Sequence, residues 1–473
     1  MSKSQKAKDL SLNTLLFTVS SFGTKIISFL LVPLYTYVLS TTDYGNLDLV
    51  NTTVQLLLPL MTLNIQDAVL RFCLDKKYNL LEVMHTGLKT AGVASIVLGL
   101  ALLIVYQIPL FHLNLTYSVY LYLLFITNIL NNIFSMYLKA VNRVKLLVVS
   151  GIVNTLMTCL LNLLLLLVYK MGVTGYLIAN ISGTVISLCI MCIGSDILKP
   201  FHGNKTAGLF KEMSQYSLPL VANSLAWWLN NASDRYILAF FCGADANGVY
   251  SVAYKIPTIL STIQGVFYNA WSISAITEFD EEDKDGFMGN VYMTYSCISI
   301  LGCSGIMLFN IWITRLLYAK DFFTAWQYVP PLLLGTVFNG IALFEGCIFT
   351  AVKKTKEVSS TTILGAVVNT IFNFILIPAI GALGAAIATM IGYFSIWFIR
   401  TLQMHKIIKL KADWKSQIFG YALLLGQCII ALNFQQIYWQ IPIVILVILS
   451  QKNYLSQIWN FVYKKIKRNR TTI

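Results

Sequence analysis

Apolar runs of about twenty residues recur along the whole chain, and short polar segments separate them. Two examples are the continuous stretches "LLNLLLLLVYK" and "IPIVILVILS". A helix of about twenty residues crosses the roughly 30 Å hydrocarbon core of a bilayer. The strands of a membrane barrel would instead show segments of about ten residues with alternating polarity. The pattern therefore predicts an all-α polytopic membrane protein.

Fourteen transmembrane helices can be drawn through these runs, and the connections leave no room for a separate soluble domain. The predicted ranges are 12–39, 47–71, 86–109, 117–138, 146–168, 174–195, 213–241, 249–276, 288–312, 328–351, 358–379, 382–402, 416–434 and 438–456. The first run is about 28 residues long, and no cleavage pattern of small residues follows it. We therefore interpret it as the first span rather than a signal peptide.

The composition and the placement of charge support this interpretation. The 473 residues are 57% hydrophobic and only 11% charged, which excludes a soluble protein of this size. If the N-terminus is cytoplasmic, almost all Lys and Arg, including Arg400, fall on the cytoplasmic side, and the external loops hold only Lys170, Arg315 and Lys320. The positive-inside rule then places both termini in the cytoplasm. The net charge of +14 thus indicates topology and anionic lipid contact, not a nucleic-acid partner.

An internal repeat relates the two halves of the chain. "GVTGYLIA" (172–179) matches "GALGAAIA" (381–388), and "GIVNT" (151–155) matches "AVVNT" (366–370) in the same order. We predict an N-terminal six-helix lobe (1–200), a second six-helix lobe (201–410), and two extra helices with a basic cytoplasmic tail (411–473). Because each copy has six spans, the lobes are parallel, as in transporters whose halves rock about a central site.

Three cations, Lys25, Arg235 and Lys255, lie inside predicted spans one, seven and eight. A charge that faces lipid is costly, so such residues usually face a bundle interior or a wet cavity. If these three converge, they form a cleft for a large anion, since Arg binds phosphate oxygens bidentately and Lys acts as a point charge. The alternatives are local pairing for Arg235 and snorkelling towards the interface for Lys255.

Three carboxylates, Asp234, Asp67 and Glu345, are candidates for coupling to an ion. Adjacent helical residues point about 100° apart, so Asp234 and Arg235 cannot easily pair with each other. Asp67 lies four residues before Arg71, and an interfacial pair between them is the alternative for that carboxylate. Energy would come from an H⁺ or Na⁺ gradient or from the membrane potential, and we expect no cofactor.

Aromatic residues near Arg235, namely Trp227, Trp228 and Tyr250, are candidates for stacking on sugar faces. An aromatic belt at the membrane interface, or simple packing, explains them equally well.

The sequence offers little for metal or enzymatic chemistry. Cys189 and Cys192 form a C-x-x-C inside a predicted span, where core packing is the better interpretation. Asp283 and Asp285 have the D-x-D spacing of many glycosyltransferases, but they stand alone in the short loop 278–287, which we interpret as a solvated linker. We find no metal site and no nucleotide-binding loop.

The segments "FGTKIISFLLVPLYTYVLSTTDYGNLDLV", "YSLPLVANSLAWWLNNASDRYIL" and "NGVYSVAYKI" resemble the bacterial polysaccharide (O-antigen and capsule, Wzx-type) flippases. These belong to the multidrug/oligosaccharidyl-lipid/polysaccharide exporter superfamily, which also holds multidrug antiporters and the lipid II flippase. The resemblance covers most of the chain and is weakest in the last two spans.

This resemblance implies two six-helix lobes around a central V-shaped cavity that works by alternating access. It implies movement of undecaprenyl-diphosphate-linked oligosaccharide across the bacterial cytoplasmic membrane, for capsule, exopolysaccharide or O-antigen synthesis. Cavity cations would hold the diphosphate and sugars, which maps onto Lys25, Arg235 and Lys255. The last two spans would flank a groove for the polyprenyl tail. Membrane lipids, a polysaccharide polymerase and glycosyltransferases are the expected partners.

Three other functions stay open. A lipid II flippase fits the resemblance, although that branch has Arg in the first span where this chain has Lys25. An ion-coupled multidrug or small-molecule exporter of the same fold predicts a cavity dominated by carboxylates. A membrane polysaccharide polymerase would need a larger external loop than the roughly fifteen residues after Arg315.

Overall fold

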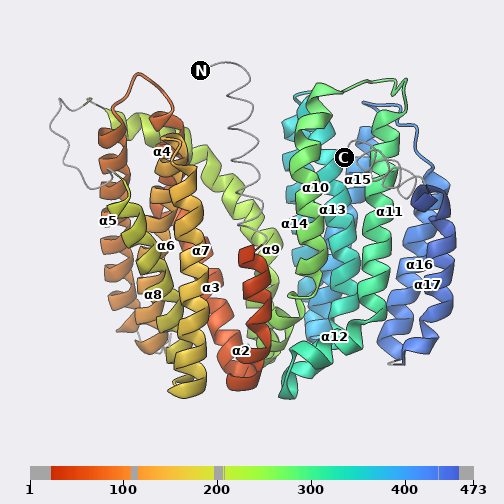
Figure 1. Cartoon of the computed structure of the whole chain (residues 1–473), viewed down its shortest axis with the longest axis horizontal. Helices are drawn as coiled ribbons and strands as arrows, with labels where there is room; N and C mark the ends of the chain where they lie inside the picture. Colours follow the sequence, from red (N-terminus) through yellow and green to blue (C-terminus); the bar gives the residue numbers. More distant parts are fainter. Residues whose placement is uncertain (1–22, 108–114, 196–205, 207, 435, 457–473) are drawn as a thin grey trace, which may run out of the picture. The chain divides into compact units, whose positions relative to one another are not determined.

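A computed structural model describes residues 23–107, 115–195, 206, 208–434 and 436–456, and these form an all-α structure (Figure 1). The chain divides into two compact units, residues 1–232 and 233–473, with the division inside helix α9. The boundary predicted from the repeat, at residues 200 and 201, lies outside the described residues, as do the basic N-terminal residues and the "KKIKRNR" tail.

The first unit is built from helices connected by short turns. Residues 23–30 are helical and lead through one turn residue into α2. The helices are α2 (Val32–Val38), α3 (Thr41–Thr62), α4 (Ile65–Cys73), α5 (Leu80–Tyr106), α6 (Leu115–Ala140), α7 (Val144–Asn162), the π-helix η2 (Leu163–Val168), α8 (Gly172–Ile193) and the first part of α9. The whole of α9 runs over Leu209–Ala253.

The second unit begins within α9, and several of its helices are more deeply buried than those of the first unit. They are α10 (Pro257–Thr277), α11 (Phe287–Leu308), α12 (Asn310–Leu317), η3 (Lys320–Gln327), α13 (Val329–Ala351), α14 (Thr355–Ile380), α15 (Ala382–Met404), α16 (Trp414–Asn433), η4 (Ile437–Trp439) and α17 (Ile441–Ser450).

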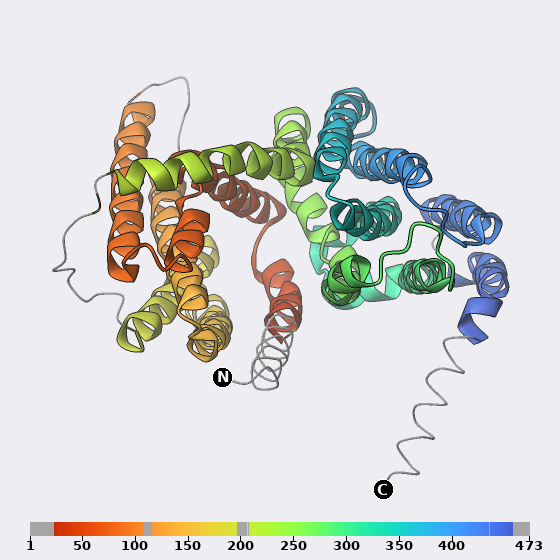
Figure 2. The same cartoon turned by 90° about the horizontal axis from the view of Figure 1, so that it is seen from above.

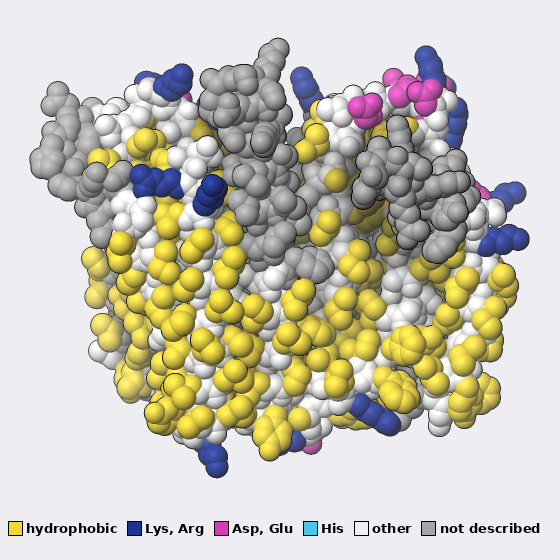
Figure 3. All heavy atoms as spheres, viewed as in Figure 1, with side chains coloured by type: hydrophobic (Ala, Val, Ile, Leu, Met, Phe, Trp, Pro, Cys, Tyr) yellow, Lys and Arg dark blue, Asp and Glu magenta, His cyan; other side chains and the backbone are white. Residues whose placement is uncertain are grey.

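Within the described residues, nine helices are long and apolar enough to span a membrane, or ten if the bent pair α3–α4 is one span. Hydrophobic side chains cover the sides of the helices, whereas Lys and Arg gather near the helix ends (Figure 3). An apolar belt between charged ends is the surface that a bilayer requires. The chain is therefore a multi-pass membrane protein, and nine or ten of the fourteen predicted spans are identified by length and composition.

The predicted second span (47–71) is broken in the structure. α3 and α4 meet at a 58° bend, where Leu63 and Asn64 both have φ of 53°. Asn tolerates this left-handed conformation better than most residues. The Asn64 side chain donates to Ser224 Oγ (2.8 Å) and accepts from Gln66 Nε2 (3.0 Å), so the bend is held by hydrogen bonds.

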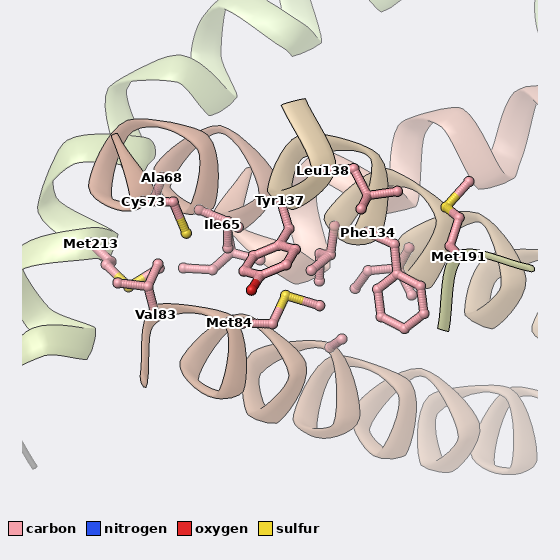
Figure 4. Packing of buried hydrophobic residues seen from close by; sticks show 14 of the residues in the cluster. Ile65, Ala68, Cys73, Val83, Met84, Phe134, Tyr137, Leu138, Met191 and Met213 are labelled. Atoms are coloured by element: carbon pink, nitrogen blue, oxygen red, sulfur yellow. The ribbon is translucent and has the colours of Figure 1, made fainter. Parts of the chain in front are cut away.

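The core of the first unit lies where α4, α5, α6 and the start of α9 meet. Figure 4 shows Ile65, Met84, Tyr137 and Met213 pointing towards one another from these four helices. Their side chains are almost fully removed from solvent. Lipid tails are as apolar as leucine, so the hydrophobic effect does not drive helices together in a membrane. Close packing of side chains holds them together instead.

Helix α13 is the centre of the second unit. It packs against α10, α11, α14, α15 and α16, which surround it when the unit is seen along the helices (Figure 2). Most of its side chains are buried, including Glu345. A helix that is buried all round can hold a charged side chain only if its neighbours supply polar partners.

Buried glutamines attach the last two helices to this unit. Gln427 of α16 accepts from Ser304 Oγ of α11 (2.7 Å) and donates to Gln440 Oε1 (3.2 Å), next to the start of α17. Tyr421 of α16 lies 3.0 Å from Ser296 Oγ of α11. α16 and α17 therefore pack as part of the second unit, beside α11 (Figures 1 and 2).

The acidic loop between α10 and α11 is ordered by hydrogen bonds. Asp283 is buried and accepts from the backbone N–H groups of Met288, Gly289 and Lys411, at 3.0 Å each. The backbone N–H of Lys284, 2.7 Å from Asp280 Oδ2, lowers the pKa of the Asp280 carboxyl. The prediction of a solvated linker is wrong for Asp283, whose carboxylate caps α11 and ties the loop to the α15–α16 connection.

Candidate functional site

The carboxylate of Asp234, on α9, lies within a cage of hydroxyl groups in the second unit. It is only 2% exposed. Its Oδ2 accepts hydrogen bonds from Tyr250 Oη (2.5 Å), Tyr254 Oη (3.1 Å) and Thr389 Oγ1 (3.4 Å). The backbone N–H of Arg235 donates to Oδ1 at 2.9 Å. These donors replace the water that a buried carboxylate loses.

A kink in α9 brings Tyr250 to Asp234. Residues sixteen positions apart on a straight helix would lie about 24 Å apart. Gly243, with φ of 89° and ψ of 169°, breaks the helix between them. This backbone conformation is essentially restricted to glycine. Because of this break, residues 244–253 turn back towards Asp234. The Tyr250 hydroxyl thereby reaches the Asp234 carboxylate.

Two carboxamides extend the cage onto α14. Asn369 Nδ2 donates to Thr389 Oγ1 (3.3 Å), and Asn373 Nδ2 donates to Asn369 Oδ1 (2.9 Å). Both asparagines and Thr389 are buried, and Asn373 Oδ1 makes no hydrogen bond within the described residues. Hydrogen bonds thus connect α14 to the Asp234 carboxylate of α9 through Thr389 of α15.

This arrangement suits a small cation. Carboxylate, hydroxyl and carboxamide oxygens are the ligands that hard cations prefer. A buried carboxylate can equally take a proton, because burial favours the neutral form. No group of three or more His, Cys, Asp or Glu that could hold a metal ion occurs in the described part of the chain. Its surroundings make Asp234 a candidate for reversible binding of H⁺ or an alkali cation.

Arg235 is held apart from the Asp234 carboxylate, as the sequence predicted for adjacent helical residues. Its guanidinium carbon lies 5.5 Å from the centre of the Tyr254 ring, a cation–π contact. The side chain is half-buried.

The other two predicted cations lie in different parts of the chain. Lys255 is half-buried in the turn 254–256 between α9 and α10, not within a helix. Pro257, at the first position of α10, has no backbone N–H to donate to the carbonyl of Ala253, which explains why the helix is interrupted here. Lys25 is exposed on the helical residues 23–30 of the first unit.

Asp67 does not pair with Arg71 among the described residues. Arg71 Nη1 lies 3.9 Å from Asp75 Oδ2 instead, and both of these side chains are largely exposed. Asp67, on α4, is half-buried.

Of the three aromatic candidates, Tyr250 is inaccessible to a sugar in the conformation described here. The side chain is fully buried, and its hydroxyl serves Asp234. Trp228 donates from Nε1 to the carbonyl of Thr52 (2.9 Å), which gives it a packing role within the first unit. Trp227 is 38% exposed and remains accessible.

Glu345, the third candidate carboxylate, is 0% exposed and lies in the last third of α13. It accepts from Thr401 Oγ1 (2.7 Å) and Tyr292 Oη (3.2 Å). Arg400 lies nearby in α15 and is 3% exposed. The side chain of Arg400, which the sequence assigns to the cytoplasmic side, lies inside the helix bundle rather than in a loop.

The comparisons with known proteins agree with this architecture. Residues 10–271 match the model of the family described as polysaccharide biosynthesis protein, which is more than half of the chain.

Two archaeal relatives are similar over part of the chain. The uncharacterized membrane protein MJ1068 of Methanocaldococcus jannaschii is 28% identical over 194 residues, 38% of this chain and 37% of that protein. The probable low-salt glycan biosynthesis flippase Agl15 of Haloferax volcanii is 22% identical over 223 residues, 45% of each. The chain thus spans less than half the length of these curated relatives.

Solved structures share the fold over nearly the whole chain. The lipid II flippase MurJ, in an inward closed conformation, has a TM-score of 0.69 at 13% identity, covering 95% of this chain and 100% of that one. An inward-facing MATE family multidrug transporter of the MOP superfamily has a TM-score of 0.61 at 12% identity, covering 82% and 96%. Together with the family match, this confirms the resemblance found in the sequence: the chain belongs to the polysaccharide biosynthesis protein family and has the fold of MurJ and the MATE transporters.

Proposed function

We propose that this protein is a flippase that moves undecaprenyl-diphosphate-linked oligosaccharide repeat units across the bacterial cytoplasmic membrane. The cargo would then supply a surface polysaccharide such as capsule, exopolysaccharide or O-antigen. The observation that carries the proposal is the family membership combined with a fold shared with a lipid II flippase. The name of the Haloferax volcanii relative, a glycan biosynthesis flippase, supports the same cargo class.

The proposal includes the finer architecture expected from the sequence. It has fourteen spans in two parallel six-helix lobes around a central V-shaped cavity, followed by two C-terminal helices, with both termini in the cytoplasm. Lys25, Arg235 and Lys255 bind the diphosphate during transport, and Trp227 contacts sugar. A polysaccharide polymerase and glycosyltransferases work on the same lipid-linked glycan.

The Asp234 cage is the proposed coupling site. Binding of H⁺ or Na⁺ neutralises the carboxylate, which lowers the cost of keeping it among Tyr250, Tyr254 and Thr389. Release of the ion would leave a charge that favours a more hydrated conformation. A gradient of the ion can thereby bias the alternation between conformations.

A reconstituted translocation assay tests the proposal. Proteoliposomes containing the protein would receive a fluorescent polyprenyl-diphosphate oligosaccharide, and the fraction that becomes accessible to an added glycosidase would be measured. We expect K25A, R235A and K255A each to reduce the rate, and K356A, which removes an exposed lysine at the start of α14, to leave it unchanged. Equal rates in all four variants would contradict the assignment of the cations.

The second candidate is an ion-coupled exporter of small molecules. Two observations favour it: the buried carboxylate cage at Asp234, and the fold likeness to MATE transporters. Deletion of the gene would then raise susceptibility to cationic drugs and leave surface polysaccharide intact, whereas the flippase predicts the reverse.

A further inference from the structure

A second buried polar cluster lies in the core of the second unit, around Glu345. The carboxyl group is fully removed from solvent, and both of its hydrogen-bond donors, Tyr292 Oη and Thr401 Oγ1, act on the same oxygen, Oε1. The other oxygen, Oε2, is buried and has no hydrogen-bond partner within the described residues. The two carboxyl oxygens therefore lie in different environments.

Arg400 does not neutralise this carboxyl by direct contact. Its guanidinium donates to the carbonyls of Ala342 (2.7 Å) and Val358 (2.9 Å), and to the hydroxyls of Thr361 (2.9 Å) and Thr362 (2.8 Å). No ion pair joins Arg400 to Glu345 in the described part of the chain. Arg400 thus uses its donors to fasten α15 to α13 and α14.

The remaining neighbours of the pair are neutral or apolar at ordinary pH. The other titratable groups facing Glu345 or Arg400 are Tyr292 of α11, Tyr421 of α16, Tyr268 of α10 and Cys347 of α13. Phe344 packs beside the site, stacked on Trp271 with ring centres 4.2 Å apart. A carboxylate here would have one oxygen without a donor in an apolar surrounding, which is strongly unfavourable.

We propose that Glu345 is a proton-binding site separate from Asp234, and that it carries its proton on Oε2 in the conformation described here. The proton comes from water and returns to water when α13 and α15 separate enough to hydrate the carboxyl. Loss of the proton leaves a charge that the closed core cannot hold, so the protonation state selects between packed and opened arrangements of these helices. This inference does not depend on the identity of the cargo.

The competing interpretation is that Glu345 is permanently ionised and balances the charge of Arg400 through space. The two interpretations differ for E345Q. Glutamine has the shape of the protonated carboxylic acid and retains the carbonyl that accepts from Thr401 and Tyr292. It lacks the negative charge that a buried arginine would need.

Infrared spectroscopy and thermal unfolding of the full-length protein in nanodiscs test the proposal. We expect a carbonyl band of protonated carboxylic acid in the wild type near neutral pH, a smaller band in E345Q because only Asp234 then contributes, and an unchanged band in E357Q, a control at a half-buried glutamate on α14. We also expect the Tm of the wild type to fall relative to that of E345Q by about 2–4 °C as the pH is raised from 6 to 9. A carboxyl group that binds its proton more tightly in the folded protein than in the unfolded chain makes the free energy of unfolding depend on pH. That free energy falls as the pH rises above about 4.3, the ordinary pKa of glutamate. Equal bands in the wild type and E345Q, or a sharp and pH-independent loss of Tm in E345Q, would overturn the proposal.

Discussion

The two units use matching positions of the internal repeat to build polar clusters of different character. Asn154 and Thr158 on α7, with Asn180 on α8, correspond in the sequence repeat to Asn369 and Asn373 on α14 and Thr389 on α15. In both units the two α7 or α14 residues are hydrogen-bonded across one helical turn: Thr158 Oγ1 donates to Asn154 Oδ1 (3.3 Å), and Asn373 Nδ2 to Asn369 Oδ1 (2.9 Å).

The packing around these residues also matches. A Cβ added to Gly183 of α8 would lie 2.8 Å from Asn154 Oδ1, and one added to Gly392 of α15 would lie 2.8 Å from Asn369 Cβ. In each unit a glycine therefore lets one helix approach an asparagine of its neighbour closely.

The clusters differ in burial and in charge. The second-unit residues are buried and connect to Asp234, whereas those of the first unit are half-buried and bond to no carboxylate among the described residues. The helix pairs α7–α8 and α14–α15 thus carry polar side chains at matching positions of the repeat. Among the described residues, only the cluster of the second unit includes a carboxylate, Asp234 of α9. We infer that ion coupling belongs to the second unit.

The largest effect should follow from D234N, which removes the charge that distinguishes the two clusters. We expect ion-dependent translocation to fall at least tenfold, the factor that corresponds to about 1.4 kcal/mol. The dependence of the remaining rate on pH or Na⁺ should also be lost. Asparagine keeps an oxygen that accepts from Tyr250 and Thr389, so the protein should fold. The assay is translocation in proteoliposomes under imposed ion gradients.

The matched control for this experiment is D245N, at an exposed position eleven residues further along α9. If D245N is impaired as much as D234N, or if D234N keeps its ion dependence, the coupling site lies elsewhere.

An intermediate effect is expected from G243A, which disturbs the kink that joins Asp234 to Tyr250. Alanine at φ 89° and ψ 169° is strained, and its Cβ would lie 2.7 Å from Asp245 Oδ1. We expect a loss of about 1–3 kcal/mol in the free energy of unfolding. G172A, at the start of α8 in the first unit, should cost less because φ there is 54° and a Cβ meets no atom within 4 Å. Unfolding in detergent, followed by tryptophan fluorescence, compares the two.

The smallest effects should come from the uncharged partners. N373A removes a buried hydrogen bond to Asn369, which is worth about 1 kcal/mol of stability. T158A removes the matching bond in the first unit, which is longer (3.3 Å) and joins half-buried residues, and should cost no more than about a few tenths of a kcal/mol. Equal losses in the two variants would show that the units are more alike than their burial indicates.

Charged residues inside apolar runs allowed the buried carboxylates to be identified from the sequence. Asp234 and Glu345 were identified because a carboxylate at membrane depth needs a special environment, and both prove to be buried with hydroxyl partners. The family and the helical membrane fold were also predictable, because apolar run length and the motif order depend only on local sequence.

Residues that act through tertiary contact were not predictable. Asn369, Asn373, Thr389 and Tyr254 are ordinary polar residues in apolar helices, and only the repeated "VNT" hinted at the first. Arg400 looked like a loop cation because it lies near a helix end, yet the packing of α13 and α14 encloses it. The break at Lys255 did carry a local signal, Pro257.

The buried glutamines of α16 and α17 constrain how the protein is made. A ribosome delivers α11 to the membrane before α16 and α17, so Ser296 and Ser304 wait for partners that have not yet been synthesised. Gln427 and Gln440 in turn would enter hydrocarbon with unsatisfied amides unless they dock on α11 and on each other as they insert. Biogenesis of this chain should therefore finish with a templated insertion step, and release of the last two helices into free lipid would expose the nascent protein to quality-control proteolysis.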